Sequence, residues 1–160
     1  MSILPILLWP DPRLSQAAAP VGRVTEEVRA LAADMLETMY AAPGRGLAGP
    51  QVGAMLRLFV MDTDWKEGAR APRVFIDPEV LELSAETVEM EEACLSIPEV
   101  TVAVTRPTSL RLAWTALDGS RHEARLDGVA ARCALHELDH LDGLVHFDRL
   151  SPEARQEGLA

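Results

Sequence analysis

The chain has 160 residues, 48% of them hydrophobic, with a net charge of −10 at neutral pH and two cysteines. This length is enough for one domain with a hydrophobic core, and the acidic balance disfavours direct binding to nucleic acid. No run of eighteen apolar residues occurs, which argues against a membrane-spanning helix. The apolar first residues lack a basic leading segment, so we expect no secretory signal, reduced thiols and a cytoplasmic location.

A first amphipathic helix is predicted between Thr25 and Pro43. Thr25 is a suitable N-cap, and two glutamates follow it in the first turn. Apolar residues then recur at helical spacing: Val28, Leu31, Met35 and Met39. The helix is expected to end before Pro43-Gly44.

The middle of the chain predicts mostly antiparallel sheet. Residues 44–53 read GRGLAGPQVG, which is typical of a loop whose backbone closely approaches another group. Apolar or alternating segments then predict strands at residues 56–61, 74–76, 80–83, 87–90, 100–104 and 110–114. Asp77-Pro78 is expected to end one of them, and Asp118-Gly119 predicts a hairpin turn.

A second helix is predicted from an Asp127 cap to Leu141, closed by Gly143. Apolar or small residues surround it, so we expect it to be buried on most sides. The order of helix, strands and helix, without repeat or linker, indicates an α+β fold. We expect a single domain over residues 1–160, with antiparallel sheets packed around the buried C-terminal helix.

The buried helix carries the sequence HELDH at residues 136–140. Buried imidazoles and carboxylates need partners. At about 100° per residue, His136 and His140 lie roughly 40° apart, and Glu137 lies roughly 60° beyond His140. Two imidazoles one turn apart can bind one cation, while the carboxylate between them moves a proton.

Two residues are candidates for a third ligand. His146 completes HELDHLDGLVH, which matches the signature of a class of zinc endoproteases. That class also needs a methionine turn after the third histidine, yet all six methionines lie at or before Met90. We therefore interpret His146 as a strand or loop residue. The other candidate is Cys94, in EEACLSIPEV, because a thiolate with two imidazoles suits a divalent transition metal, although this residue taken alone is equally well explained as a buried structural cysteine.

Three motifs in this order, GLAGPQVG, EACLS and HELDH, resemble those of the peptide deformylase family. The resemblance extends from WPDPRL near the start, through TRP at residues 105–107, to FDRL at residues 147–150. It covers nearly the whole chain. It implies a deformylase-like fold and hydrolysis of the formyl group of N-formylmethionyl peptides, including nascent chains on the ribosome, to formate and a free amine.

The resemblance also implies a metal centre. Its ligands would be Cys94, His136 and His140, with one divalent ion that is commonly Fe²⁺ and replaceable by Zn²⁺ or Ni²⁺. Glu137 would be the general base and later the general acid. Gln51, through its side-chain amide, and Leu95, through its backbone N–H, would stabilise the oxyanion.

Further roles are expected around this centre. The backbone near Gly46 and Leu47 would pair with the substrate as an added strand, and Ile97 would line a pocket for the methionine side chain. Behind the metal ligands, we expect buried charges to orient them: Arg106, Glu92 and Asp139.

Four residues depart from the family pattern: Ala93, Gly49, Leu135 and Glu99. We expect them to crowd or recharge the walls near the open coordination position. Ala93 and Leu135 keep a second hypothesis open, in which the chain is an altered paralogue that binds metal or peptide without turnover. The short tail after Ser151 leaves little of the terminal helix that some members use to dock on the ribosome.

Overall fold

The computed structural model describes residues 2–149, apart from the side chains of Glu99 and Phe147. It contains two α-helices, α1 (Glu26–Ala41) and α2 (Gly128–Leu141). Both helices were predicted, and the α+β fold is confirmed. Within residues 2–149, no helix is long and apolar enough to cross a membrane.

Within residues 2–149, seven strands form two antiparallel sheets. The larger sheet has the order β1-β2-β3-β6-β7, and the smaller consists of β4 and β5. Their bounds are β1 (Gly46–Ala48), β2 (Leu58–Met61), β3 (Arg73–Leu83), β4 (Thr87–Cys94), β5 (Ile97–Pro107), β6 (Ser109–Thr115) and β7 (Arg121–Asp127). The β6–β7 hairpin closes near Gly119, which has a positive φ, as the Asp118-Gly119 turn predicts.

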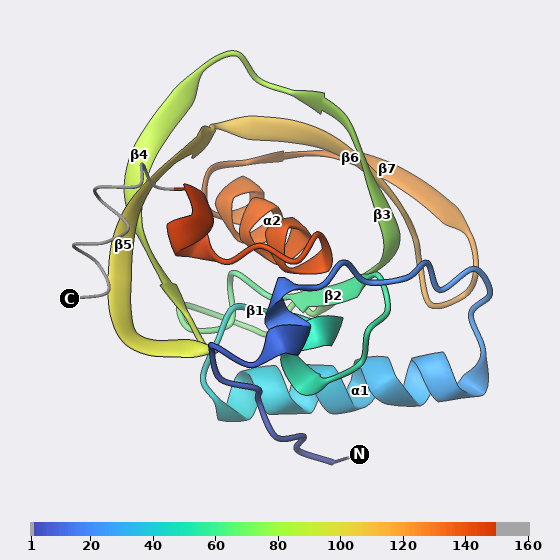
Figure 1. Cartoon of the computed structure of the whole chain (residues 1–160). Coiled ribbons are helices and arrows are strands. Elements are labelled where there is room, and N and C mark those ends of the chain that lie inside the picture. The colour runs from blue at the N-terminus through green and yellow to red at the C-terminus, as the bar shows by residue number, and fades with distance from the viewer. Residues whose placement is uncertain (1, 150–160) are drawn as a thin grey trace.

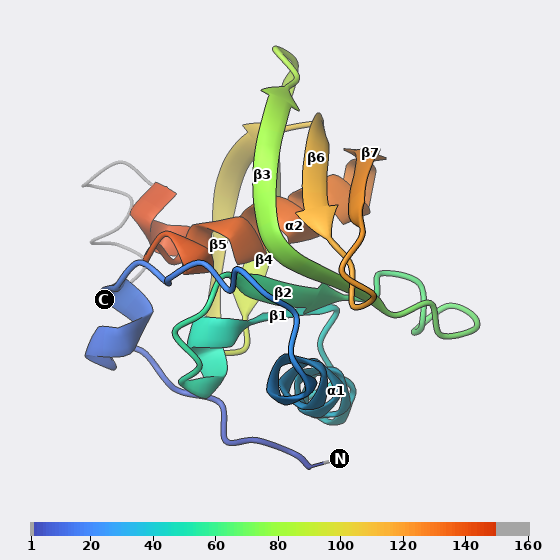
Figure 2. The ribbon, with the colours of Figure 1, turned by 90° about the vertical axis from the view of Figure 1, so that its right-hand side faces the viewer.

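The two helices lie on opposite sides of the β1–β2 part of the larger sheet (Figures 1 and 2). Helix α2 is enclosed by the strands, and its buried residues pack with those of β2, β3, β6 and β7, among them Phe59, Phe75 and Leu112. Helix α1 packs a second cluster, including Met35 and Met39, against the other face. The sheets therefore hold α2 in a fixed position at the centre of the molecule.

One strand was wrongly predicted as two. We expected Asp77-Pro78 to end a strand, but β3 runs continuously through it, with a shift in its pairing to β6 between Ile76 and Glu79. Asp77 adopts a positive φ of 47°, which aspartate tolerates better than most residues. Its carboxylate accepts the N–H groups of Val21 and Gly22, so this bulge also holds the incoming N-terminal segment.

The ends of α2 match the prediction in position but not fully in chemistry. Asp127 occupies the N-cap position, yet its side chain makes no cap hydrogen bond and instead accepts one from Arg125. Gly143 closes the helix with a φ of +79°. Leu135 was expected near the open coordination position, but it packs against the core cluster around α2 and does not line the pocket beside Cys94 and His136, so that expectation was wrong.

The predicted loop at residues 44–53 contains two short elements, β1 and a 3₁₀ helix at Gly49–Val52. Gly49 lies where a side chain would have no room. A Cβ there would lie 2.7 Å from the carbonyl oxygen of Ala54 and 2.8 Å from that of Leu56. Gly49, which departs from the family pattern, therefore suits the local backbone and does not crowd the pocket.

We expect Gly49→Ala to lower the free energy of unfolding by about 1–3 kcal/mol, because backbone atoms cannot yield as a flexible side chain can. Urea unfolding measures the change. Gly68→Ala is the matched control, since the nearest atom to its Cβ would lie at 3.9 Å. Equal stability of the two variants would contradict this account of Gly49.

Candidate metal centre

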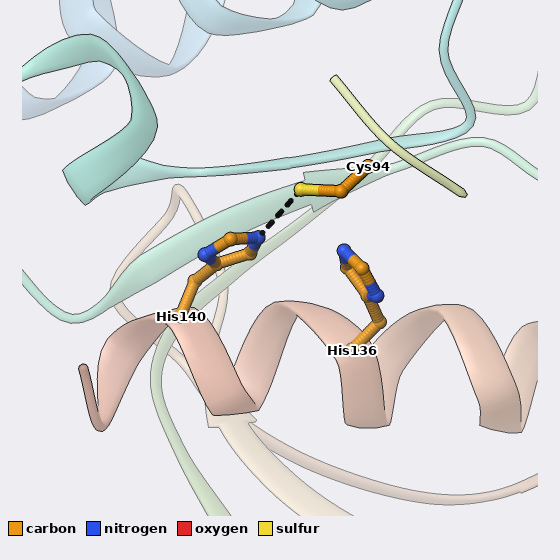
Figure 3. Close-up of side chains that lie close together, drawn as sticks. All are labelled: Cys94, His136 and His140. Carbon is orange, nitrogen blue, oxygen red and sulfur yellow. Dashed lines mark hydrogen bonds between the residues drawn. The ribbon is translucent and has the colours of Figure 1, made fainter. Parts of the chain in front are cut away.

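Three potential metal ligands converge between α2 and the end of β4. The ligand atoms of Cys94, His136 and His140 all lie within 4.8 Å of one another. The sulfur of Cys94 lies 3.3 Å from Nε2 of His140. Figure 3 shows the two imidazoles rising from successive turns of α2 toward the thiol. Tetrahedral coordination with bonds of ~2.0–2.3 Å separates ligands by roughly 3.4–3.8 Å, so this arrangement fits a small divalent ion.

Glu92 orients the first of these imidazoles. Its carboxylate lies 2.9 Å from Nδ1 of His136, an arrangement that leaves Nε2 for the metal. Burial alone would raise the pKa of Glu92, but hydrogen bonds from Arg106 and His136 outweigh it and lower that pKa to about 2. Burial also disfavours charge on His136, yet its contacts with Cys94 and Glu92 hold its pKa well above the usual value.

The second imidazole is less constrained by the protein. Nε2 of His140 faces the thiol, and its Nδ1 has no hydrogen-bond partner in the described part of the chain. The residue is fully buried, and burial lowers its pKa well below the usual value. His140 is therefore neutral near pH 7, as a metal ligand must be.

A chain of buried charges lies behind the ligands. Arg106 is 4% exposed and donates to Glu92 at 2.8 Å and to Asp139 at 2.9 Å. Asp139 also accepts hydrogen bonds from Arg149, in the 3₁₀ turn that follows α2. The structure therefore brings Arg106, Glu92 and Asp139 together. Breaking such a buried network by removing one partner typically costs ~3–5 kcal/mol.

Glu137 points to the same pocket as the ligands. It is 3% exposed, and its Oε1 has no hydrogen-bond partner among the described residues. Burial raises the pKa of this carboxyl to about 7. A carboxyl with a pKa near the working pH can both accept and return a proton.

The carboxylate of Glu137 packs directly on the backbone of β1. A Cβ at Gly46 would lie 2.6 Å from Oε2 of Glu137 and 2.7 Å from Sγ of Cys133. The absence of a side chain at Gly46 therefore leaves room for the carboxylate in this position.

We expect Gly46→Ala to lower kcat/KM for hydrolysis of a formylmethionyl peptide, the reaction that the resemblance implies, by about 100-fold. The added methyl group would displace the Glu137 carboxylate from its position beside the potential metal ligands. Metal content should stay at the wild-type level, since no ligand is touched. Steady-state kinetics and metal analysis of the same preparation test both parts. Wild-type kinetics in Gly46→Ala would rule out this role for the glycine.

Gln51 is held by three neighbours. Its Oε1 accepts the N–H of Ala48 at 2.9 Å, so its Nε2 faces the other way, toward Ser96 at 3.1 Å and Cys94 at 3.8 Å. Its side chain is 1% exposed. The amide N–H groups are thus directed to the metal-ligand region, as an oxyanion donor requires.

A pocket of about 480 Å³ opens onto this centre. The predicted residues that line it include Gly46, Leu95 and Ile97, together with Cys94, His136 and Glu137. Ala93 also lines it, whereas the side chain of Glu99 lies outside the described residues. Leu47 does not line it, because its side chain is fully buried in the cluster around α1.

His146 does not belong to the group of potential ligands. It lies in the 3₁₀ turn His146–Arg149, and its Nε2 lies 3.1 Å from the carbonyl oxygen of Val100. Its ring centroid is 6.0 Å from that of His136. The position agrees with a loop residue after the helix, and the zinc endoprotease alternative is not favoured.

A family model described as polypeptide deformylase matches residues 3–156. The chain belongs to the peptide deformylase family. It is 51% identical over 151 residues to the peptide deformylase of Afipia carboxidovorans, covering 94% of this chain and 88% of the relative. It is 49% identical over 156 residues to the peptide deformylase of Acinetobacter baumannii, covering 98% of this chain and 88% of that relative.

Solved deformylase structures share the fold. The peptide deformylase of Ehrlichia chaffeensis in complex with actinonin superposes with a TM-score of 0.93 and 35% identity, covering 99% of this chain and 95% of that one. The peptide deformylase of Thermotoga maritima superposes with a TM-score of 0.89 and 39% identity, covering 95% of this chain and 100% of that one. The resemblance to the deformylase family is therefore confirmed, and deformylases are metalloenzymes, in agreement with the cluster of one thiol and two imidazoles.

Two residues of this deformylase site, Arg132 and Ser96, were missed by sequence reasoning. Arg132 donates to Glu92 and to the carbonyl oxygens of Val104 and Val88, so it joins α2 to both strands of the small sheet. Its position four residues before His136 places it on the same helix face, which was a usable signal. Ser96, the partner of Gln51, lies within the quoted EACLS motif but received no role.

Proposed function

We propose that this chain removes the N-formyl group from the formylmethionine of nascent peptides, releasing formate and a free amino terminus. The observation that carries the proposal is the position of the Glu137 carboxyl. It lines one pocket with Cys94 and His136, two of the three potential metal ligands, inside a fold shared with deformylases along nearly the whole chain. A binding-only paralogue would not need a buried proton-accepting group there.

Cys94, His136 and His140 would hold one divalent ion. A thiolate with two imidazoles suits a divalent transition metal, and we propose Fe²⁺ as the ion in the cell, with Zn²⁺ or Ni²⁺ able to replace it. When bound, the ion supplies Lewis-acid chemistry that polarises the formyl carbonyl and acidifies water. Glu92, Arg106 and Asp139 keep the ligands oriented.

The protein's own groups account for the remaining steps. Glu137 accepts the proton of the attacking water and returns it to the nitrogen of the leaving amine. Gln51 Nε2 and the backbone N–H of Leu95 donate to the oxyanion that forms at the formyl carbon. Gly46 and the backbone of Leu47 pair with the peptide, and the methionine side chain lies against apolar groups that include Ile97.

The acidic chain is expected to meet nascent peptides in the cytoplasm without binding RNA directly, since its net charge is −10. Association with the ribosome would place it where formylated termini emerge. The tail after Ser151 lies outside the described residues.

Formate release from a formyl-Met-Ala-Ser peptide, using iron-loaded protein prepared without oxygen, tests the proposed reaction. The proposal predicts one formate per new amino terminus and little turnover of the acetyl-Met-Ala-Ser analogue, whose extra methyl group crowds the reacting carbon. Absence of formate despite a full complement of bound metal would leave the binding-only hypothesis standing.

Metal binding is expected to release protons at pH 7. A cation favours the deprotonated forms of Glu137 and His136, whose pKa values the protein raises. Metal affinity should therefore rise with pH and fall as pH drops below 7. Calorimetry of Zn²⁺ binding in buffers of different ionisation enthalpy counts these protons. A carboxyl with a pKa of about 7 is about half protonated at pH 7, so the number of protons released on metal binding should be lower by about half a proton in Glu137→Gln. An unchanged number of released protons would refute this contribution of Glu137.

A further inference from the structure

Trp65 lies behind one wall of the pocket, in the connection between β2 and β3. Its indole Nε1 donates a hydrogen bond of 3.0 Å to the carbonyl oxygen of Gly44, a residue of the pocket wall. Its ring forms a T-shaped pair with that of Tyr40, with the centroids 5.2 Å apart and the planes nearly perpendicular. Trp65 therefore joins helix α1 to the wall.

Asp62 rigidifies the β2–β3 connection, which contains Trp65. Its buried carboxylate accepts the backbone N–H groups of Asp64 and Trp65 at one end of the connection and of Ala71 at the other. It also accepts the hydroxyl proton of Tyr40 at 2.6 Å. Four donors on one carboxylate fix the position of Trp65 relative to the sheet.

The backbone of Gly44 contacts both Trp65 and Leu95, and Leu95 also lines the pocket. A Cβ added at Gly44 would lie 2.7 Å from Cδ1 of Leu95, so the Leu95 side chain occupies the space where a side chain at position 44 would begin. The next carbonyl, that of Arg45, accepts the N–H of Asp62 at 2.8 Å. The carbonyls of Gly44 and Arg45 are thus both held by residues of the β2–β3 connection, just before Gly46 reaches the Glu137 carboxylate.

We infer that Trp65 is a positioning residue for the reaction, which it serves by fixing the Gly44–Gly46 backbone against which the peptide substrate pairs. The inference rests on the proposed function, because it needs a substrate that adds as a strand beside β1. Loss of the indole N–H leaves the carbonyl of Gly44 without this donor and lets the wall move. The consequence is weaker substrate binding, while His136, Glu137 and His140 stay in place on α2 and Cys94 stays at the end of β4.

Trp65→Phe tests the inference, because phenylalanine keeps an aromatic ring beside Tyr40 but has no N–H. KM for a formyl-Met tripeptide is expected to rise about three- to tenfold, as the loss of one hydrogen bond implies, with kcat within twofold and metal content unchanged. Trp65→His provides the rescue, since its Nε2–H lies the same number of bonds from the backbone. Its KM should fall between those of the wild type and Trp65→Phe.

Trp114→Phe is the matched control, because Trp114 packs between Phe75 and His122 away from the pocket. It should lower the melting temperature without raising KM. A wild-type KM in Trp65→Phe, or an equal rise in Trp114→Phe, would overturn the inference. If the wild type itself releases no formate, the proposed function fails, so the two failures are distinguishable.

Discussion

Replacing Glu137 with glutamine should lower kcat by about 10²–10⁴-fold while leaving the bound metal in place. Glutamine has nearly the same size as glutamate but cannot accept a proton from water. Glu137 is buried, has an Oε1 without a hydrogen-bond partner in the described chain, and has a pKa raised by burial to about 7. Formate release, with metal content measured on the same sample, tests the expectation.

Glu123→Gln is the control for this experiment. Glu123 is exposed on β7 and pairs with Arg111, so removing its charge changes the net charge equally without touching the pocket. Its kinetics should match the wild type. If Glu137→Gln retained more than about a tenth of the wild-type kcat, Glu137 would not be the proton-transfer group.

The second large effect is expected for Cys94→Ala, which should weaken metal binding by more than about 100-fold and abolish turnover. The thiol lies 3.3 Å from His140 Nε2 and is the only sulfur in the group of potential ligands found within residues 2–149. Two imidazoles alone leave too few protein ligands for a tetrahedral site. Competition with a chromophoric chelator gives the dissociation constants.

Two variants control for the loss of a cysteine and of a nearby histidine. Cys133→Ala removes the other thiol, which hydrogen bonds to the carbonyl of Arg45, and should bind metal as the wild type does. His146→Gln can keep the contact with the carbonyl of Val100 and should also bind normally. Loss of the metal in His146→Gln but not in Cys94→Ala would instead favour the zinc endoprotease arrangement.

The sequence predicts those features that depend on local spacing. The positions of His136, Glu137 and His140 follow from one turn of a buried helix, and Thr25 caps α1 through the N–H of Val28 as its position predicts. The assignment of Cys94 depended on the family resemblance. The spacing of residues along the sequence does not predict that the end of β4 contacts a helix more than forty residues away.

Features that depend on tertiary contacts were missed. Strand β1 has three residues, too few for a periodic signal, and exists because it pairs with β2. Strand β3 continues through Asp77 because a positive φ there is stabilised by Val21 and Gly22, over fifty residues away. The contact of Trp65 with Gly44 spans 21 residues and carries no motif.

The most direct test of the central claim is X-ray absorption spectroscopy on protein loaded with one equivalent of Fe²⁺ or Zn²⁺. The account predicts a single sulfur at about 2.3 Å and two imidazole nitrogens, at ~2.0–2.1 Å for Zn²⁺. A first coordination sphere without sulfur, or with three imidazoles, would contradict it.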